Sequence, residues 1–371
     1  MRLSRPFLRW SAAAAATAVL LATGACSTGD DGGPSTGELL GSVETNYGLI
    51  EIPKPADGDL KVVALGWSDG EVALSLGVKP VAIYDWQDHG EANKGVGPWA
   101  TAAFGDSTPA LIERGGETLN YEQIQSFDPD VILNARSAFD DQAYARLSQI
   151  APTVFAPKGT PDFALDWRTH TTLIAQALGR VEQGRALIAD LDATFATYVG
   201  ENPTFQGVTI VAGSKFGDAY GANLPGDARF DVFGALGFTL NPPVAALPAS
   251  GFFAPVSVEQ VPAMDAQVAV LTTIGYPISA IQQDPLISSL DVVKDGRTVF
   301  LDPEGEAMQG ATAGTVAGLK VALAAVVPQL RAAVAKLDRC RSPISLLMAV
   351  SGASSAVVPF TRLYRGGCQM F

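Results

Sequence analysis

Two segments of the chain, 137 positions apart, carry the same pattern. Residues 119–133 and 256–271 each contain a polar residue that can cap a helix, a Glu-Gln pair, and an acidic or amide residue followed by an apolar run. A repeat at this distance predicts two α/β lobes of the same build rather than a short-period solenoid. Two such lobes leave a cleft between them, and small molecules commonly bind in clefts between domains.

Composition supports two well-packed domains and argues against nucleic acid as a partner. The 371 residues are 47% hydrophobic and 17% charged, enough for a large core. All 38 acidic residues lie between Asp30 and Asp338, whereas seven of the 25 lysines and arginines lie outside that span, which leaves 18 inside it and a net charge of −20 there. A surface this acidic repels phosphate backbones.

The N-terminus has the pattern of a secretion signal. Arg2, Arg5 and Arg9 precede an apolar run over residues 10–22, and small residues then lead to Cys26. This junction resembles the lipobox of bacterial lipoproteins, which implies a signal peptide over 1–25, a lipid on Cys26 and a flexible tether over 26–43. An ordinary cleavage site with a chance cysteine is the alternative.

The C-terminal segment, residues 339–371, is atypical. It has four arginines, no acidic residue and an apolar run over 344–360 that is marginal for spanning a bilayer. We expect a poorly ordered extension. Cys340 and Cys368 could pair outside the cytoplasm, but their spacing does not decide it.

Hydrophobic periodicity alternates between strands and helices along the body of the chain. This predicts two Rossmann-like α/β lobes with mainly parallel sheets, an N-terminal lobe over 44–180 and a C-terminal lobe over 201–338. A long helix over 181–200 falls midway between the two repeats and is expected to join the lobes. The expected strands are 61–65, 80–83, 131–133, 153–155, 208–212, 268–271 and 299–301; the other expected helices are 69–76, 140–148, 163–178, 230–236 and 315–336.

Aromatic and cationic residues follow several of these strands. Ligands approach the carboxyl ends of strands in such sheets, so we expect these side chains to contact a ligand there. Aromatic faces and cations together suit a planar or metal-complexed organic molecule with delocalised negative charge. Each tryptophan could instead pack its loop, and Trp167, on a predicted helix, is assigned to packing. The candidate ligand-binding residues are Trp67, Tyr84, Trp86, Trp99, Arg136, Lys215, Tyr220, Arg229 and Tyr276.

The exposed glutamates of the repeat, Glu122 and Glu259, form a second candidate site. They occupy equivalent places on the two lobes, and such a pair suits docking onto a partner with two symmetric arginine pockets. The alternative is that each is a first-turn charge that stabilises its helix.

Other chemistries are poorly supported. Residues 66–70 match the G-x-S-x-G nucleophile elbow and offer Ser68, but the two histidines, His89 and His170, do not lie where a triad needs one. Two histidines and no cysteine cluster argue against a metal held by protein ligands, so any metal would arrive already chelated. No glycine-rich nucleotide loop is present.

Motifs over residues 44–336 resemble those of the ferric-siderophore binding lipoproteins of bacterial ABC importers. The resemblance implies two lobes joined by a rigid helix, a ferric siderophore held through its oxygens by arginine and aromatic residues, and docking of Glu122 and Glu259 on arginines of a permease dimer. The tail after Asp338 departs from the family pattern. The matching motifs are Ile52–Pro55, Val62–Leu65, Ala73–Val81, Val96–Trp99, Tyr121–Ile124, Pro129–Leu133, Tyr144, Leu147–Pro152, Ala177–Arg180, Asp284–Leu286, Val293–Lys294 and Gly296–Arg297.

The expected protein is therefore a monomeric receptor, anchored by lipid on the outer face of the cell membrane, with no catalytic activity. Its expected cofactors are none beyond the lipid at Cys26, and iron(III) enters only as a siderophore chelate. A cobalamin or haem receptor of the same fold is the alternative within the class. A lipid-anchored serine hydrolase that uses Ser68 is the alternative outside it.

Overall fold

The computed structural model describes residues 38–112 and 119–341. The expected signal peptide, the lipid site at Cys26 and the Cys340–Cys368 pair fall outside the residues whose side chains are described. The described chain opens with a hairpin of β1 (Leu39–Thr45) and β2 (Gly48–Pro53). The expected tether over 26–43 therefore overlaps this hairpin. Strand pairing begins at Leu39 because Val43 and Ile52 bury their side chains in the first-lobe core.

The first lobe has a parallel sheet, as the sequence predicts. Its five strands lie in the order β5-β4-β3-β6-β7, and the edge strand β5 was not among the expected strands. Helix α5 packs against α1 and the β1 strand. Its N-terminus is fixed by Asp166, which accepts hydrogen bonds from the backbone N–H groups of Arg168 and Thr169. The strands are β3 (Val62–Ala64), β4 (Ala82–Tyr84), β5 (Ala110–Ile112), β6 (Val131–Leu133) and β7 (Thr153–Val154), and the helices α1 (Asp69–Ser75), α2 (Pro98–Thr101), α3 (Tyr121–Ser126), α4 (Asp141–Leu147) and α5 (Trp167–Ala177), with 3-10 turns η1 (Glu91–Asn93) and η2 (Ala102–Phe104).

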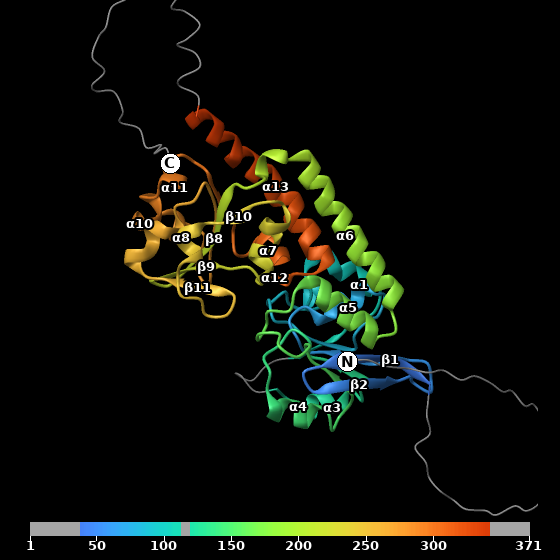
Figure 1. Ribbon diagram of the computed structural model, residues 1–371. Helices are drawn as coiled ribbons and strands as arrows, with labels where there is room; N and C mark the ends of the chain where they lie inside the picture. The colour runs from blue at the N-terminus through green and yellow to red at the C-terminus, as the bar shows by residue number, and fades with distance from the viewer. Residues whose placement is uncertain (1–37, 113–118, 342–371) are drawn as a thin grey trace, which may run out of the picture. The chain divides into compact units, whose positions relative to one another are not determined.

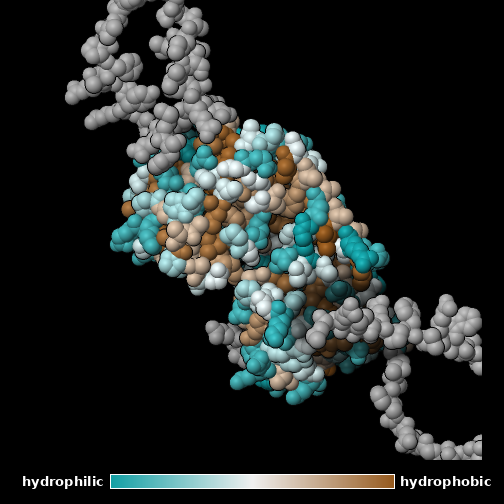
Figure 2. Space-filling model, in the orientation of Figure 1, coloured by the Kyte–Doolittle hydropathy of each residue, from teal (hydrophilic) through white to brown (hydrophobic). Residues whose placement is uncertain are grey.

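Helix α6 (Val181–Glu201) leads from the first lobe into the second, close to the predicted range. It contacts both α5 and α13 (Val316–Arg341) (Figure 1). Leu191 and Phe195 of α6 are buried against the second-lobe core, whereas the outer side of α6 shows hydrophilic side chains interspersed with apolar ones (Figure 2). Trp167 packs with Phe195, which confirms its assignment to packing.

Helix α13 closes the second lobe. Its span Val316–Leu337 is long and apolar enough to cross a membrane by length and composition alone. Leu319, Leu323 and Leu330 are fully buried in the core cluster that surrounds the second sheet. Burial on this scale is typical of the core helix of a globular domain.

The sheet of the second lobe is mainly parallel, as predicted, with two antiparallel pairings toward one edge. β8 pairs in parallel with β10 and β12, and β12 with β13, but β9 runs antiparallel to both β8 and β11. The turn Gly217-Asp218 reverses the chain, with Gly217 at a φ of +60° that favours glycine. The elements are β8 (Thr209–Phe216), β9 (Ala219–Asn223), β10 (Thr239–Leu240), β11 (Phe253–Val256), β12 (Val268–Thr273), β13 (Thr298–Phe300), α7 (Ala228–Ala235), α8 (Pro242–Ala245), α9 (Ser279–Gln282), α10 (Pro285–Ser288), α11 (Asp291–Lys294), α12 (Glu306–Ala313), η3 (Pro203–Phe205) and η4 (Val258–Met264).

Residues of the sequence repeat accept backbone hydrogen bonds at the amino ends of both sheets. In the first lobe, Asp130 Oδ2 accepts the backbone N–H of Lys61 at 2.7 Å, just before β3. In the second, Gln267 Oε1 accepts the backbone N–H of Thr209 at 2.9 Å, where β8 begins. Each repeat thus satisfies a donor at the start of the first central strand of its lobe.

The short helices of the repeat are capped as predicted but differ in type. The Asn120 side chain accepts the N–H of Gln123 at the start of α3, and Ser257 forms a capping box with Gln260 at the start of η4. The second helix is 3-10 rather than α and contains Pro262, which lacks the N–H that an α-helical bond requires.

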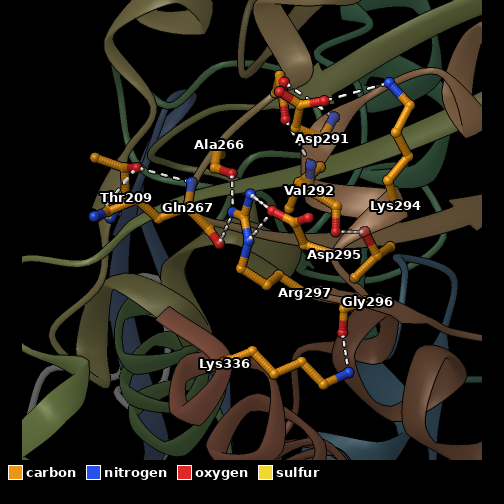
Figure 3. Close-up of polar contacts among 12 residues, drawn as sticks. Thr209, Ala266, Gln267, Asp291, Val292, Lys294, Asp295, Gly296, Arg297 and Lys336 are labelled. Carbon is orange, nitrogen blue, oxygen red and sulfur yellow. Dashed lines mark hydrogen bonds and ion pairs between the residues drawn. The ribbon is translucent and has the colours of Figure 1, made fainter. Parts of the chain in front are cut away.

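Arg297 reinforces the same amino edge of the second lobe (Figure 3). Its Nη1 donates to the carbonyls of Ala266 and Gln267 at 2.9 and 2.6 Å, and Nη2 pairs with Asp295 at 2.9 Å. This arginine is 8% exposed and serves the fold.

Candidate ligand-binding site

Three of the predicted residues meet at the carboxyl end of the first-lobe sheet. Trp67 and Trp86 stack with ring centroids 4.4 Å apart and planes 7° from parallel. The guanidinium carbon of Arg136 lies 5.8 Å from each ring centroid. Phe163 stacks on Trp67 at 4.3 Å and completes the cluster, although the sequence placed it at the start of a helix.

The turn after β3 sets the geometry of this stack. Ser68 has a φ of +62°, a left-handed conformation that is unusual for a residue with a side chain. Its hydroxyl accepts a hydrogen bond from the Trp86 indole Nε1 at 3.2 Å. Ser68 is therefore a fixed acceptor that holds Trp86 against Trp67.

Arg136 extends from the first lobe to the second. It is 7% exposed; Nε donates to the carbonyl of Phe163 at 3.1 Å, and Nη1 donates to those of Thr312 and Ala313 at 3.1 and 2.8 Å. The last two carbonyls end α12, where a cation is favourable. Burial lowers the pKa of Arg136 to about 10, so the side chain stays protonated at neutral pH. Within the described residues the hydrogen bonds of Arg136 come from Nε and Nη1, and Nη2 can donate to a ligand.

Two buried carboxylates, those of Asp69 and Glu71, accept hydrogen bonds next to the place where Arg136 reaches the second lobe. Asp69 accepts the backbone N–H of Ala135 at 2.7 Å and lies 2.6 Å from His170 Nε2. Glu71 accepts from the backbone of Gly97, from Trp99 Nε1 and, across the lobes, from Thr315 Oγ1. Trp99 thus packs against its own lobe, apart from the Trp67 cluster.

Lys215 and Tyr220 lie on paired strands, not in the loop that the sequence predicted. Both bind Asp284: Lys215 Nζ lies 2.5 Å from its Oδ2, and the Tyr220 hydroxyl donates to the same oxygen at 2.6 Å. Burial opposes the charge on Lys215, but hydrogen bonds to Asp284 and Tyr220 outweigh it and raise the pKa of Lys215. Burial likewise opposes ionisation of Asp284, but hydrogen bonds from Lys215 and Tyr220 lower the pKa of Asp284. The pair is ionised at neutral pH.

Arg229 is also paired. Its Nε and Nη2 donate to the two carboxylate oxygens of Asp227 at 2.8 and 2.7 Å, a bidentate contact. Asp227 caps the start of α7, close to Arg136. After burial, the charges of Asp227 and Arg229 have the largest effects on the pKa of Arg136, which Asp227 raises and Arg229 lowers. Tyr276, on the β12–α9 loop, is 50% exposed.

Tyr84 opens onto a hollow at the ends of β4 and β5. The hollow has a volume of about 1030 Å³, large enough for a sizeable organic ligand. Its ionisable lining residues, Tyr84 aside, are Asp85, Asp88, Glu91 and Lys94.

The two lobes, the joining helix and this junction agree with a family match over residues 62–304, described as periplasmic binding protein. The chain belongs to the periplasmic binding protein family. This is an extracytoplasmic family of binding proteins, not of enzymes, so the alternative of a serine hydrolase at Ser68 is excluded.

Relatives and solved structures agree with this membership. A probable siderophore-binding lipoprotein, YfiY of Bacillus subtilis, is 32% identical over 134 residues, which cover 36% of this chain and 37% of the relative. A periplasmic solute binding protein of Mycobacterium smegmatis matches at 25% identity with a TM-score of 0.69, over 79% of this chain and 98% of that one. PiaA of Streptococcus pneumoniae in complex with ferrichrome matches at 22% identity with a TM-score of 0.67, over 80% and 99%.

The glutamates of the repeat are both exposed on this binding protein. Glu122 lies in the first turn of α3 and Glu259 in the first turn of η4. Hydrogen bonds from its own backbone N–H and from the Ser257 hydroxyl lower the pKa of Glu259, so it is ionised at neutral pH.

Proposed function

We propose that this binding protein is a lipid-anchored receptor that captures a ferric siderophore outside the membrane and delivers it to the permease of an ABC importer. The observation that carries the proposal is the cluster of Trp67, Trp86 and Arg136 where the lobes meet. Arg136 Nη2 would donate to an oxygen that coordinates the iron, and the tryptophan faces would cover the organic part of the chelator.

The proposed anchor is a lipid on Cys26, which leaves a tether that ends where β1 begins at Leu39. The relative YfiY, named as a lipoprotein, supports this assignment. We propose that the receptor acts as a monomer and docks on a permease dimer through Glu122 and Glu259. Two exposed carboxylates at equivalent places on the two lobes suit two symmetric arginine pockets.

Tryptophan fluorescence tests the binding step. Trp67 and Trp86 lie beside Arg136, so a ferric complex bound there should quench their emission in a saturable titration at submicromolar ligand. Arg136→Ala should weaken that binding by about 1.5–3 kcal/mol, the value of a hydrogen bond to a charged group. A flat response to ferric siderophores, with saturation by haem or cobalamin, would move the protein to another cargo.

The docking step needs uptake measurements in cells. Glu122→Arg combined with Glu259→Arg should abolish uptake of the ferric complex while the purified variant still binds it. A matched control reverses two exposed carboxylates elsewhere, Glu182→Arg and Asp192→Arg on α6. Normal uptake by the first variant would refute the docking surface.

A further inference from the structure

We propose that the cargo is an uncharged ferric trihydroxamate rather than an anionic ferric catecholate or hydroxycarboxylate; this inference rests on the function proposed above. Each hydroxamate loses a single proton on binding iron(III), so a trihydroxamate complex of this kind is neutral. Each catecholate loses two, so a tris-catecholate complex is a trianion. The charge available at the carboxyl edges of the two sheets therefore distinguishes the classes.

The second-lobe cations at this edge are already neutralised. Lys215 pairs with Asp284, whose side chain is 7% exposed, and Arg229 forms its bidentate contact with Asp227, whose side chain is 5% exposed. An anionic ligand would have to compete with carboxylates that are fixed in place by the fold. Asp284 also caps α10 through the N–H of Leu286, and Asp227 caps α7 through the N–H of Arg229. Neither carboxylate can move away without uncapping a helix.

Arg136 offers the remaining positive group of the cluster, and its charge is heavily compensated. Its Nε and Nη1 are committed to three main-chain carbonyls, so in the part of the chain that the structure describes Nη2 is the nitrogen left for a ligand. Three carboxylates act on its charge, those of Asp227, Asp69 and Glu71, against one other cation, Arg229. This arrangement provides a directional donor rather than a field that attracts a trianion.

The surroundings are acidic as well. The hollow beside Tyr84 carries the carboxylates of Asp85, Asp88 and Glu91 against the ammonium of Lys94. The net charge of −20 between Asp30 and Asp338 adds a long-range repulsion.

The aromatic groups fit a neutral complex. Trp67, Trp86 and Phe163 form a continuous stack, and Tyr276 and Ile274 expose large apolar surfaces at the end of β12, 50% and 46% accessible. A trihydroxamate carries apolar linkers between its iron-binding groups, and burial of these linkers supplies binding energy without charge. Its iron-bound oxygens still accept the hydrogen bond that Nη2 can donate.

The direct test compares three iron(III) complexes on the full chain by tryptophan quenching, with equilibrium dialysis of labelled iron as an independent readout. The complexes are ferrichrome, a hexadentate tris-catecholate and ferric citrate. We expect ferrichrome to bind at least about 100-fold more tightly than either anionic complex. Equal or tighter binding of an anionic complex would overturn this inference and leave the receptor function standing. No binding of any complex would overturn both.

Two variants test whether the neutralisation of Lys215 and Arg229 causes the preference for an uncharged complex. Asp284→Asn frees Lys215 and Asp227→Asn frees Arg229, while asparagine can still cap the helices. Each should shift the ratio of affinities toward the tris-catecholate by about tenfold or more, because one unneutralised charge then faces the ligand. Asp291→Asn removes the same charge from the pair with Lys294 at the amino edge (Figure 3) and should leave the ratio unchanged. An unchanged ratio in both folded test variants would refute the inference.

Discussion

Replacement of the buried Glu71 by glutamine, which has the same shape, should lower the free energy of unfolding. Glu71 is 3% exposed; Oε1 accepts from the Gly97 backbone at 3.1 Å, and Oε2 accepts from Trp99 Nε1 at 2.7 Å and Thr315 Oγ1 at 2.9 Å. In Glu71→Gln one oxygen becomes an NH₂ group. If that group faces Gly97, two donors oppose each other; if it faces Trp99, the indole N–H loses its acceptor.

The expected cost follows from these contacts. One orphaned buried donor costs about 1–3 kcal/mol, and the remaining bonds lose their charge assistance, so the free energy of unfolding should fall by about 2–4 kcal/mol. For roughly 300 ordered residues, the usual entropy of unfolding converts this to a loss of about 3–6 °C in Tm. Thermal and urea unfolding, followed by circular dichroism, measure both quantities.

The control is Glu182→Gln on α6, where the side chain is 79% exposed and pairs with Arg185. It should change stability by less than about 0.5 kcal/mol. The further double variant Glu71→Gln with Thr315→Val should cost less than the sum of the single changes, because the two residues share a bond. A Glu71→Gln protein as stable as the control would refute the reasoning.

Three further outcomes are expected. Trp86→Phe loses the hydrogen bond to Ser68 and part of the stack, so ferrichrome should bind about two- to tenfold more weakly in the quenching assay; unchanged affinity would place Trp86 outside the site. Burial and the hydrogen bond to Asp141 raise the pKa of Tyr47 to about 12, so the stability this phenol provides is present below pH 10 and lost between pH 10 and 12; Tyr47→Phe should flatten that part of a Tm–pH profile, and parallel profiles would contradict it. Asp130→Ala removes the acceptor for the Lys61 N–H and should cost about 1–3 kcal/mol in urea unfolding, and no loss would show that solvent replaces the bond.

Local patterns predicted much of the fold because they act over short distances. Asn120 and Ser257 cap the helices that the repeat indicates, and α6 spans almost the range that its periodicity gives. The sequence did not predict the β8–β9 hairpin, because the expected apolar strand ends at residue 212, before Lys215 and Tyr220. The Gly217-Asp218 turn was the available signal, since glycine followed by aspartate is a common hairpin turn.

The candidate site was only partly predictable. Trp67, Trp86 and Arg136 come together because the carboxyl ends of parallel strands share an edge, which the sequence can indicate. The partners of Lys215 and Arg136 were not visible in the same way. Asp284 lies 69 residues beyond Lys215, and the carbonyl of Ala313 lies 177 beyond Arg136, so these contacts depend on tertiary packing.

The repeat at the amino ends of the sheets separates two tasks within each lobe. Asp130 and Gln267 fix where the central strands begin, at the edge opposite the one that carries the tryptophan and arginine cluster. Substitutions at the carboxyl edge can therefore accumulate without disturbing strand register. A scaffold divided in this way can exchange one chelator for another by altering side chains at that edge, provided that the buried acceptors Asp69 and Glu71 are kept.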